Sequence, residues 1–475
     1  MALPTQTDDF PGWYQEVVRQ ADLAENSLAR GTMVIKPYGF AIWEAIQGAM
    51  DAVIKRTGHQ NLYFPMLIPS RLLEREKEHV EGFAPEVAVV THAGGEDLAE
   101  PLMLRPTSET IIWDAYSRWV QSYRDLPLLY NQWANIVRWE MRPRLFLRTT
   151  EFLWQEGHTA HETAEEAWEE TLRMLEAYRE VAEGTMAMPV HKGRKTAAER
   201  FPGAVETTTI EALMRDRKAL QSGTSHYLGQ NFAKAYGVTF LGRDGEEHFA
   251  EATSWGSSTR LVGGLIMVHG DDKGLRLPPK VAPVQVVIVP IFRSDDEKTR
   301  VLEASEKMAG AWRVAGLRVK VDDRDDLRPG YKFADHELRG VPVRVEVGPR
   351  DLDADQVTLA RRDTGDKMAL PLAGVEDVLV GLMPEIQQVL LDDAIAFRDA
   401  HTHRVKSEDE LRDALAGDGG FVIGAWCGGA DCESKVKADT KATIRFLPLE
   451  QEDPGAACVV CGAAGIEIAT WAIAY

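Results

Sequence analysis

Arginine is concentrated in one short stretch of this 475-residue chain, between Asn135 and His158. The arginines of the stretch are Arg138, Arg142, Arg144 and Arg148. Apolar-alternating runs on both sides predict two antiparallel strands joined by a loop longer than a tight hairpin. A guanidinium binds phosphate oxygens in pairs, Phe152 offers a ring face to a base, and Glu140 offers a carboxylate to an amine. The stretch therefore suits a nucleotide, but a solvated basic hairpin explains these residues about equally well.

A second candidate is the pair Thr107 and Glu109, which follows a predicted strand at Leu102–Leu104. A buried carboxylate at a strand end is a suitable partner for an ammonium group. The simpler interpretation is a helix cap, with Thr107 or Ser108 as N-cap and Glu109 in the first turn. Taken alone, these residues favour the cap.

A third candidate is Arg260, which ends a run of small residues from Ala252 and begins the apolar segment Leu261–His269. Small residues let a ligand approach the backbone closely, and an arginine at that point can reach a terminal phosphate. A strand-to-helix junction with a surface arginine is the alternative.

The cysteines form two close pairs near the end of the chain. They are Cys427, Cys432, Cys458 and Cys461. The spacing of the second pair is that of a zinc knuckle, and four residues separate the first pair. This pattern predicts a structural, tetrahedral zinc site, because four thiolates leave no open position for water. Two reduced pairs that only pack together are the less favoured alternative.

Composition limits the classes of function. The chain carries a formal net charge of −20, has a pI of about 5.1 and contains 44% hydrophobic residues. A uniformly basic nucleic-acid binder is excluded, so an RNA partner would have to use local basic surfaces. No apolar run reaches transmembrane length and Met1–Phe10 lacks a signal peptide, so we expect a cytoplasmic protein without a membrane partner. The length predicts two to four domains.

The first half of the chain mixes helical and extended patterns. Amphipathic spacing predicts helices at Pro11–Leu28, Gly39–Arg56 and Ala164–Glu183. Short strands are predicted at Gly31–Pro37 and Asn61–Pro69, the second containing Pro65.

The second half opens with a proline-rich linker at Pro278–Pro283. The apolar run Val284–Pro290 predicts a buried parallel strand. Predicted elements then alternate as helix, strand, helix and strand, which favours a small α/β domain. These elements are Asp295–Ala315, Leu317–Val321, Gly330–Leu338 and Pro342–Val347. A linker helix near Val375–Asp399 precedes the cysteine-containing segment.

Three of these stretches, in this order, resemble the three signature motifs of class II aminoacyl-tRNA synthetases. The helix and strand around Pro65 resemble the first motif, the arginine-rich hairpin the second, and the Arg260 junction the third. Further stretches resemble prolyl-tRNA synthetases of the type shared by archaea, eukaryotic cytosol and some bacteria. They are Lys192–Thr196, Phe201–Ala204, Thr207–Ala212, Gln221–Phe232, Pro329–Phe333 and Gly340–Arg344. The segment from Gly157 to Ala252 leaves no room for the editing domain that some bacterial relatives insert.

The resemblance assigns roles that spacing alone does not. It implies that Arg138 and Arg260 are catalytic and that proline is bound by Thr107, Glu109, Arg138 and His226. ATP, with Mg²⁺, would be bound by Arg138, Glu140, Arg148, Thr149, Phe152, Gln221, Thr224, Ser258 and Arg260. Glu337 and Arg344 would read the two guanines of a proline anticodon, which suits the donor and acceptor pattern of guanine.

The implied fold class is α+β, with an antiparallel synthetase sheet flanked by helices, an α/β anticodon-binding domain and a small zinc-binding domain. We expect these at residues 1–278, 284–384 and 385–475. The implied activity is ligation of L-proline to proline tRNA through a prolyl-adenylate, by a homodimer. Physical reasoning alone leaves a threonine or serine synthetase open, and also a regulator that binds uncharged tRNA. The apolar end Trp471–Tyr475 predicts burial. The resemblance implies that Tyr475 docks near the catalytic domain, where its carboxylate can approach the active site, and packing on the zinc-binding domain alone is the alternative.

Overall fold

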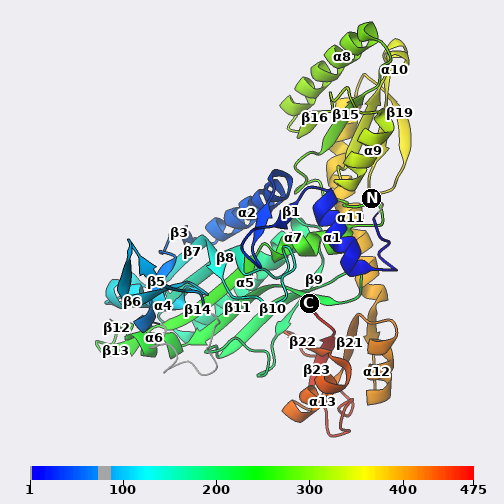
Figure 1. Ribbon diagram of the computed structural model, residues 1–475. Helices are drawn as coiled ribbons and strands as arrows, with labels where there is room; N and C mark the ends of the chain where they lie inside the picture. The colour runs from blue at the N-terminus through cyan, green and yellow to red at the C-terminus, as the bar shows by residue number, and fades with distance from the viewer. Residues whose placement is uncertain (1–2, 73–86) are drawn as a thin grey trace.

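The computed structural model describes residues 3–72 and 87–475, so residues 1–2 and 73–86 of the expected catalytic region lie outside the description. An eleven-stranded sheet forms the body of the molecule (Figure 1). Its strands, in spatial order, are β20 (Thr402–Arg404), β21 (Phe421–Trp426), β23 (Glu467–Ala472), β22 (Thr443–Pro448), β9 (Val190–Arg194), β10 (Glu206–Leu213), β11 (Ala219–Gly229), β14 (Glu251–Ser258), β8 (Glu151–His161), β7 (Leu128–Val137) and β3 (Gln60–Asn61). All neighbouring strands are antiparallel except the outermost pair at each edge. The antiparallel sheet expected for the catalytic region is confirmed.

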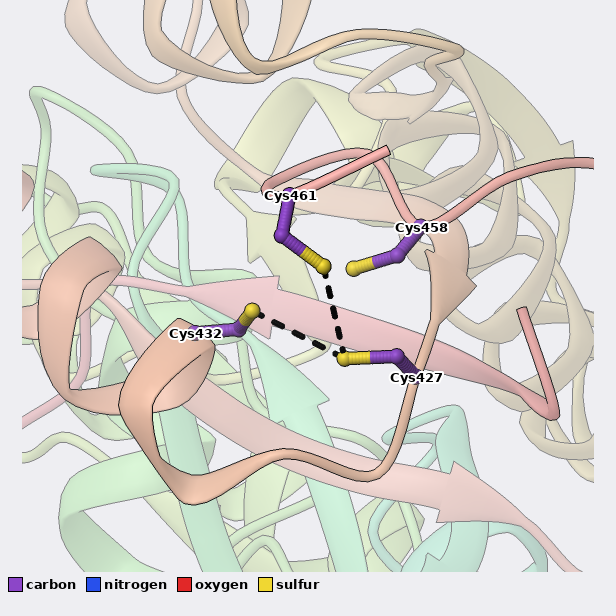
Figure 2. A group of neighbouring side chains, drawn as sticks. All are labelled: Cys427, Cys432, Cys458 and Cys461. Atoms are coloured by element: carbon purple, nitrogen blue, oxygen red, sulfur yellow. Dashed lines mark hydrogen bonds between the residues drawn. The ribbon is translucent and has the colours of Figure 1, made fainter. Parts of the chain in front are cut away.

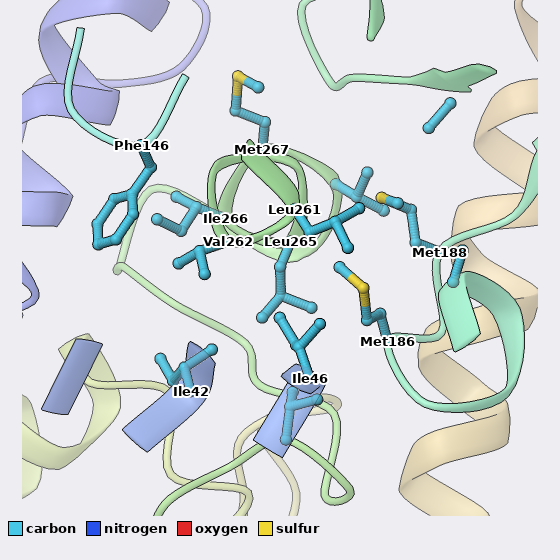
Figure 3. Close-up of a cluster of buried hydrophobic side chains, with 14 of the residues drawn as sticks. Ile42, Ile46, Phe146, Met186, Met188, Leu261, Val262, Leu265, Ile266 and Met267 are labelled. Atoms are coloured by element: carbon cyan, nitrogen blue, oxygen red, sulfur yellow. The ribbon is translucent and has the colours of Figure 1, made fainter. Parts of the chain in front are cut away.

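Helices pack on this sheet and form the largest core. They are α1 (Phe10–Gln20), α2 (Pro37–Arg56), α5 (Ala164–Gly184) and α7 (Arg260–His269). Figure 3 shows α7 end-on, with Val262 and Leu265 directed toward Ile42 and Ile46 of α2. Burying each such side chain contributes about 1.5–3 kcal/mol. The core therefore holds α7 firmly in place, and with it the arginine at its N-terminus.

A second cluster of elements covers the sheet where β7 and β14 begin and β8 and β11 end. It contains α4 (Glu109–Trp119), the short helix η1 (Tyr123–Asp125), α6 (Asn231–Tyr236), the hairpin β12 (Thr239–Leu241) and β13 (Glu247–Phe249), and the small sheet β4 (Leu67–Pro69), β6 (Glu96–Leu104) and β5 (Val89–Ala93). The β6–α4 connection carries Thr107 and Glu109. The end of β6 and the start of α4 thus bring these two side chains to the sheet.

The α/β region lies at the upper end of the view in Figure 1. Its five-stranded sheet has the order β16 (Val319–Val321), β15 (Val286–Pro290), β17 (Val343–Val347), β18 (Gln356–Arg361) and β19 (Lys367–Pro371). Its helices are α8 (Asp295–Val314), α9 (Pro329–Leu338), α10 (Pro349–Asp353) and the start of α11 (Val375–Ala400). The first strand, β15, pairs in parallel with β16 and β17, as the sequence predicts.

Glycine permits the catalytic region and the α/β region to approach each other closely. Gly274 has a φ of +127°, and a Cβ there would lie 2.6 Å from the Leu338 carbonyl oxygen. The next residue, Leu275, donates its N–H to the same oxygen at 2.9 Å. Arg362 adds a bidentate ion pair with Asp271 at 2.6 and 2.8 Å. These contacts fix the α/β region against the loop that follows α7.

The C-terminal part of the chain, which we call the C-terminal module (residues 401–475), contains β20 to β23, α12 (Glu408–Ala416) and α13 (Ala430–Thr440). Most of its apolar side chains form a cluster of their own, but Phe421, Phe446 and Ala472 pack with Leu213 and Ala219 of the catalytic region. The module also extends the central sheet, because β22 pairs with β9 through Leu447 opposite Arg194 and Pro448 opposite Gly193. Nothing in the sequence indicated this junction.

Two of the predicted elements are wrong in extent. The helix predicted at Pro11–Leu28 ends at Gln20, because Asp22 adopts a left-handed φ of 61° and the chain continues as β1 (Ala24–Asn26), paired with β2 (Met33–Ile35). The strand predicted at Asn61–Pro69 divides into β3 and β4, which belong to different sheets. Pro65 lies in the break, where it has no N–H to offer a ladder.

None of the helices within residues 3–72 and 87–475 combines the length and apolar character that crossing a membrane requires.

Candidate active site

A cavity of about 350 Å³ opens over the centre of the large sheet, within the range common for small-molecule sites. Among its lining residues are nine that the sequence singled out, namely Thr107, Glu109, Arg138, Phe152, Gln221, Thr224, His226, Ser258 and Arg260. A second cavity of about 300 Å³ shares Arg138, Phe152, Ser258 and Arg260 with it. The remaining candidates for ATP line this second cavity, namely Glu140, Arg148 and Thr149. The structure thus brings every expected proline and ATP residue to one composite site.

Strand alternation explains much of the lining. Side chains two apart in a strand lie on one face of a sheet, and β8 presents Phe152, Trp154, Glu156 and His158 to the cavity. The neighbouring β14 contributes Ser254 opposite His158 and continues the same wall. Our sequence analysis missed Trp154, Glu156 and His158 as site residues. The two-residue period that starts at Phe152 is the signal that would have found them.

Arg138 follows directly after β7, and its side chain is exposed to the cavity. Its Nε donates to the Pro106 carbonyl oxygen at 2.8 Å, and its guanidinium lies 5.6 and 5.4 Å from the ring centroids of Phe152 and Trp154. Although one side is open, the protein around it lowers the pKa of Arg138 by desolvation, and the negative charges of Glu109 and Glu156 oppose that shift. Within residues 3–72 and 87–475 no carboxylate forms an ion pair with Arg138, which leaves its charge free for a ligand.

Arg260 is the first residue of α7 and points a second positive charge into the same space. Its Nε donates to the Leu147 carbonyl oxygen at 3.2 Å. Burial, together with the charges of Arg148 and Arg138, lowers the pKa of Arg260 to about 10, so the group remains charged at neutral pH. Three guanidinium groups that repel one another favour a polyanionic ligand between them, because such a ligand relieves the repulsion.

The part of the cavity around Glu109 combines a carboxylate with aromatic walls. Glu109 is only 4% exposed and accepts a hydrogen bond from the Thr107 hydroxyl. Phe201 lies 4.6 Å from the His226 ring, centroid to centroid, and the Thr207 hydroxyl bonds His226 Nδ1 at 2.9 Å. Burial lowers the pKa of His226 to about 3, with a smaller contribution from His158, so this imidazole is neutral. The arrangement suits a small apolar ring that carries a cationic amine.

Two further lining residues, Glu156 and His158, form a buried pair. Burial alone would raise the pKa of Glu156, but the 2.9 Å hydrogen bond from His158 holds that pKa below its usual value. Burial would likewise lower the pKa of His158, but the bond to Glu156 and the charge of Glu109 raise it instead. The pair therefore adds both signs of charge in balance.

Both expected anticodon residues line one cavity of about 260 Å³ in the α/β region. The Arg344 guanidinium carbon lies 4.2 Å from the Phe333 ring centroid, and one of its nitrogens pairs with Glu346 at 2.9 Å. Glu337 pairs with Lys273 at 3.1 Å. A carboxylate, a guanidinium and a ring face in one pocket provide the groups needed to bind and stack a base.

The four cysteine Sγ atoms converge, all within 4.8 Å of one another (Figure 2). Cys432 projects from α13, and its Sγ lies 3.7 Å from that of Cys427, which lies 3.7 Å from that of Cys461. A tetrahedral Zn²⁺ with bonds of about 2.3 Å separates its ligands by about 3.8 Å. The geometry therefore fits a four-thiolate zinc site.

Tyr475 lies on the β10–β11 hairpin of the catalytic region. Its hydroxyl donates to Asp216 at 2.6 Å, and its N–H donates to the Ala219 carbonyl oxygen at 3.2 Å. The expected docking near the catalytic region is therefore found. Tyr475 is not among the residues that line the cavity, so an approach of its carboxylate to the site remains a prediction.

Comparison with known proteins agrees with this geometry along the whole chain. Residues 91–269 match the model of the tRNA synthetase class II core domain (G, H, P, S and T), residues 285–382 the anticodon binding domain, and residues 408–475 the prolyl-tRNA synthetase C-terminal domain. A proline--tRNA ligase of Porphyromonas gingivalis is 53% identical, covering 100% of this chain and 99% of the relative. One of Salinibacter ruber is 54% identical over 95% of each.

A solved structure shows that the similarity also holds in three dimensions over nearly the whole chain. The crystal structure of prolyl-tRNA synthetase from Cryptosporidium parvum, complexed with halofuginone and AMPPNP, superposes with a TM-score of 0.94 at 40% identity and covers 99% of each chain. The order of the three signature motifs, the composite cavity and these full-length similarities lead to one assignment. The chain belongs to the prolyl-tRNA synthetase family of class II aminoacyl-tRNA ligases.

Proposed function

We propose that this protein activates L-proline with ATP and transfers the prolyl group to the 3′-terminal adenosine of proline tRNA. The observation that carries the proposal is the composite cavity, whose lining gathers arginines, a buried carboxylate and aromatic walls. The carboxylate of proline attacks the α-phosphorus of MgATP, the bond to the bridging oxygen breaks, and pyrophosphate leaves. A ribose hydroxyl of the tRNA then attacks the carbonyl carbon, and AMP leaves.

In the first step the protein positions the reactants and stabilises charge, and it needs no general acid or base. Arg138 would hold the α-phosphate, where negative charge develops, and Arg260 the terminal phosphate. Phe152 would stack on adenine, and Glu140 would accept from its amine. The other side chains proposed to contact ATP are Arg148, Thr149, Gln221, Thr224 and Ser258.

In the same step Glu109 and Thr107 would bind the secondary ammonium of proline, and neutral His226 would face its ring. The low pKa of His226 supports this role, because a second positive charge there would repel the ammonium group. The acidic side chain and the neutral imidazole together would select an apolar amino acid over an acidic one.

We also propose the division into a catalytic region (1–278), an anticodon-binding region (284–384) and a zinc-binding region (385–475), whose Cys₄ site holds a structural Zn²⁺. The apolar clusters centred on each region support this division. We further propose a cytoplasmic homodimer. Free thiols in a metal-type cluster are typical of a reducing compartment. Exposed apolar residues near the first signature motif, Phe40, Tyr63 and Leu67, favour a covered interface there.

Aminoacylation tests the RNA part of the proposal. Purified protein with ATP and radiolabelled proline should charge proline tRNA. Arg344→Ala should lower kcat/KM for the tRNA, with a loss of about 1–3 kcal/mol in transition-state stabilisation, the value of one good base contact. Arg344 lies in the α/β region, in a cavity separate from the ATP cavities, so the variant should retain proline-dependent ATP–pyrophosphate exchange. An equal loss of both activities would show a structural role for Arg344. The exposed Arg350 in the same region offers a matched control, and Arg350→Ala should charge tRNA normally.

A further inference from the structure

The segment that joins β9 to β10, residues 195–205, forms one wall of the active-site cavity. Glu199, Arg200, Phe201 and Pro202 all line the cavity. The segment has no helix or strand of its own. Contacts with other parts of the molecule must therefore set its position.

One anchor of this segment belongs to the C-terminal module. The Thr196 hydroxyl donates to Glu433 Oε1 at 2.7 Å, and the two residues are 3% and 5% exposed. Glu433 belongs to α13 and directly follows Cys432, whose thiol is one of the four converging sulfurs. One turn later in α13, Lys437 lies 3.5 Å from Glu199. The helix that carries a metal-site cysteine thus holds the cavity wall at two points.

A second anchor lies at the start of the segment. Lys195 Nζ donates to Glu211 Oε1 and to the carbonyl oxygen of Arg445, both at 2.7 Å. The Arg445 side chain, which comes from β22 of the C-terminal module, pairs with Glu211 at 3.0 Å. All three groups are buried, so their charges depend on one another for compensation. The start of the segment is therefore fixed jointly by the catalytic sheet and the module.

At its other end the segment supports the aromatic wall. The Phe201 N–H donates to the Thr207 hydroxyl at 3.0 Å, and the same hydroxyl bonds His226 Nδ1 at 2.9 Å. The Phe201 ring packs against the His226 ring at 4.6 Å. Four residues lie between Thr196 and Phe201, so the two anchors hold the ends of one short stretch of chain.

We propose that the C-terminal module sets the geometry of the proline pocket, with Glu433 acting through Thr196 as a positioning residue. The inference rests on the proposed function and goes beyond it, because it gives the module a role in amino-acid binding. The segment leads from this contact to Phe201, whose ring packs against His226, the residue proposed to face the proline ring. Loss of the contact should therefore weaken proline binding selectively.

Thr196→Val removes the hydroxyl with little change of shape and leaves the neighbour of the metal site intact. We expect KM for proline in ATP–pyrophosphate exchange to rise about three- to tenfold, the effect of one buried hydrogen bond, with KM for ATP within twofold of the wild type. Zinc content should be unchanged, and any fall in melting temperature should not exceed that expected for the loss of one buried hydrogen bond. Glu433→Ala should raise KM for proline likewise, and Glu433→Gln, which still accepts from Thr196, should restore it.

The control is Glu408→Ala, which removes a carboxylate of the same module that pairs with Arg412 and Lys435 within the module. It should leave both KM values unchanged. A wild-type KM for proline in Thr196→Val would overturn the inference, as would equal rises in both KM values with a lower melting temperature. Absence of exchange in the wild type would instead overturn the proposed function, and the inference with it.

Discussion

We expect Arg138→Ala to lower kcat/KM for proline-dependent ATP–pyrophosphate exchange by roughly two to three orders of magnitude, because about 3–4 kcal/mol of transition-state stabilisation is lost. The guanidinium is held by Pro106 and lies beside the Phe152 and Trp154 rings, so it is oriented before a ligand arrives. Negative charge develops on the oxygens of the α-phosphate during attack. A preoriented cation therefore stabilises the transition state more than it stabilises the ground state. The loss should appear in kcat as well as in KM, measured by steady-state exchange.

Arg142→Ala is the matched control. Arg142 belongs to the same loop, is exposed, and is not among the residues that line either cavity of the site. Exchange by this variant should stay within about twofold of the wild type, since a surface charge has little effect through solvent. An unchanged rate for Arg138→Ala, with the protein folded, would contradict the role we give to Arg138.

We expect the Cys432→Ser variant to lose its bound zinc. Elemental analysis should give one zinc per chain in the wild type and close to none in the variant, because a tetrahedral site loses most of its affinity with one thiolate. Structural zinc contributes about 10–16 kcal/mol in small peptides, so the loss here should amount to several kcal/mol. Thermal or denaturant unfolding should show the C-terminal module melting first, and a rise in KM for proline should follow, because Glu433 adjoins Cys432.

Ser434→Ala controls for the substitution itself, because Ser434 is exposed on the same helix. It should retain zinc and stability. Wild-type protein that contains no zinc and shows four titratable thiols would contradict the site. A Cys432→Ser protein that keeps a full zinc equivalent would do the same.

Much of the fold follows from local pattern. The apolar period of α2 and α5, the helix-strand alternation after Pro283 and the small-residue strand before Arg260 are local signals, and the structure has these elements where the sequence predicts them. Helix ends are less determined, as Asp22 shows, because one left-handed residue ended a helix whose apolar pattern continued. The pairing of β22 with β9 could not be predicted, because it joins residues about 250 positions apart through backbone hydrogen bonds.

In the site, too, local sequence patterns identify some residues, whereas contacts between distant segments identify others. Arg138 and Arg260 were singled out by residue type together with the order of the three signature motifs, and both line the cavity. Phe201 could not be identified from its type, because an aromatic residue near proline and glycine is common in loops. Its role depends on His226, which lies on another strand, and on Thr196, whose partner lies in the C-terminal module. Contacts between distant segments are therefore what the structure adds.

Amino-acid selection is the most direct test of the central claim, because it depends on Glu109, His226 and the aromatic wall together. ATP–pyrophosphate exchange should be measured with purified protein and proline, serine or threonine at equal concentrations. We expect exchange with proline and none above background with serine or threonine, because neither offers an apolar ring to the wall formed by Phe201 and His226. Exchange driven by threonine or serine, or no exchange with any of the three, would contradict the account.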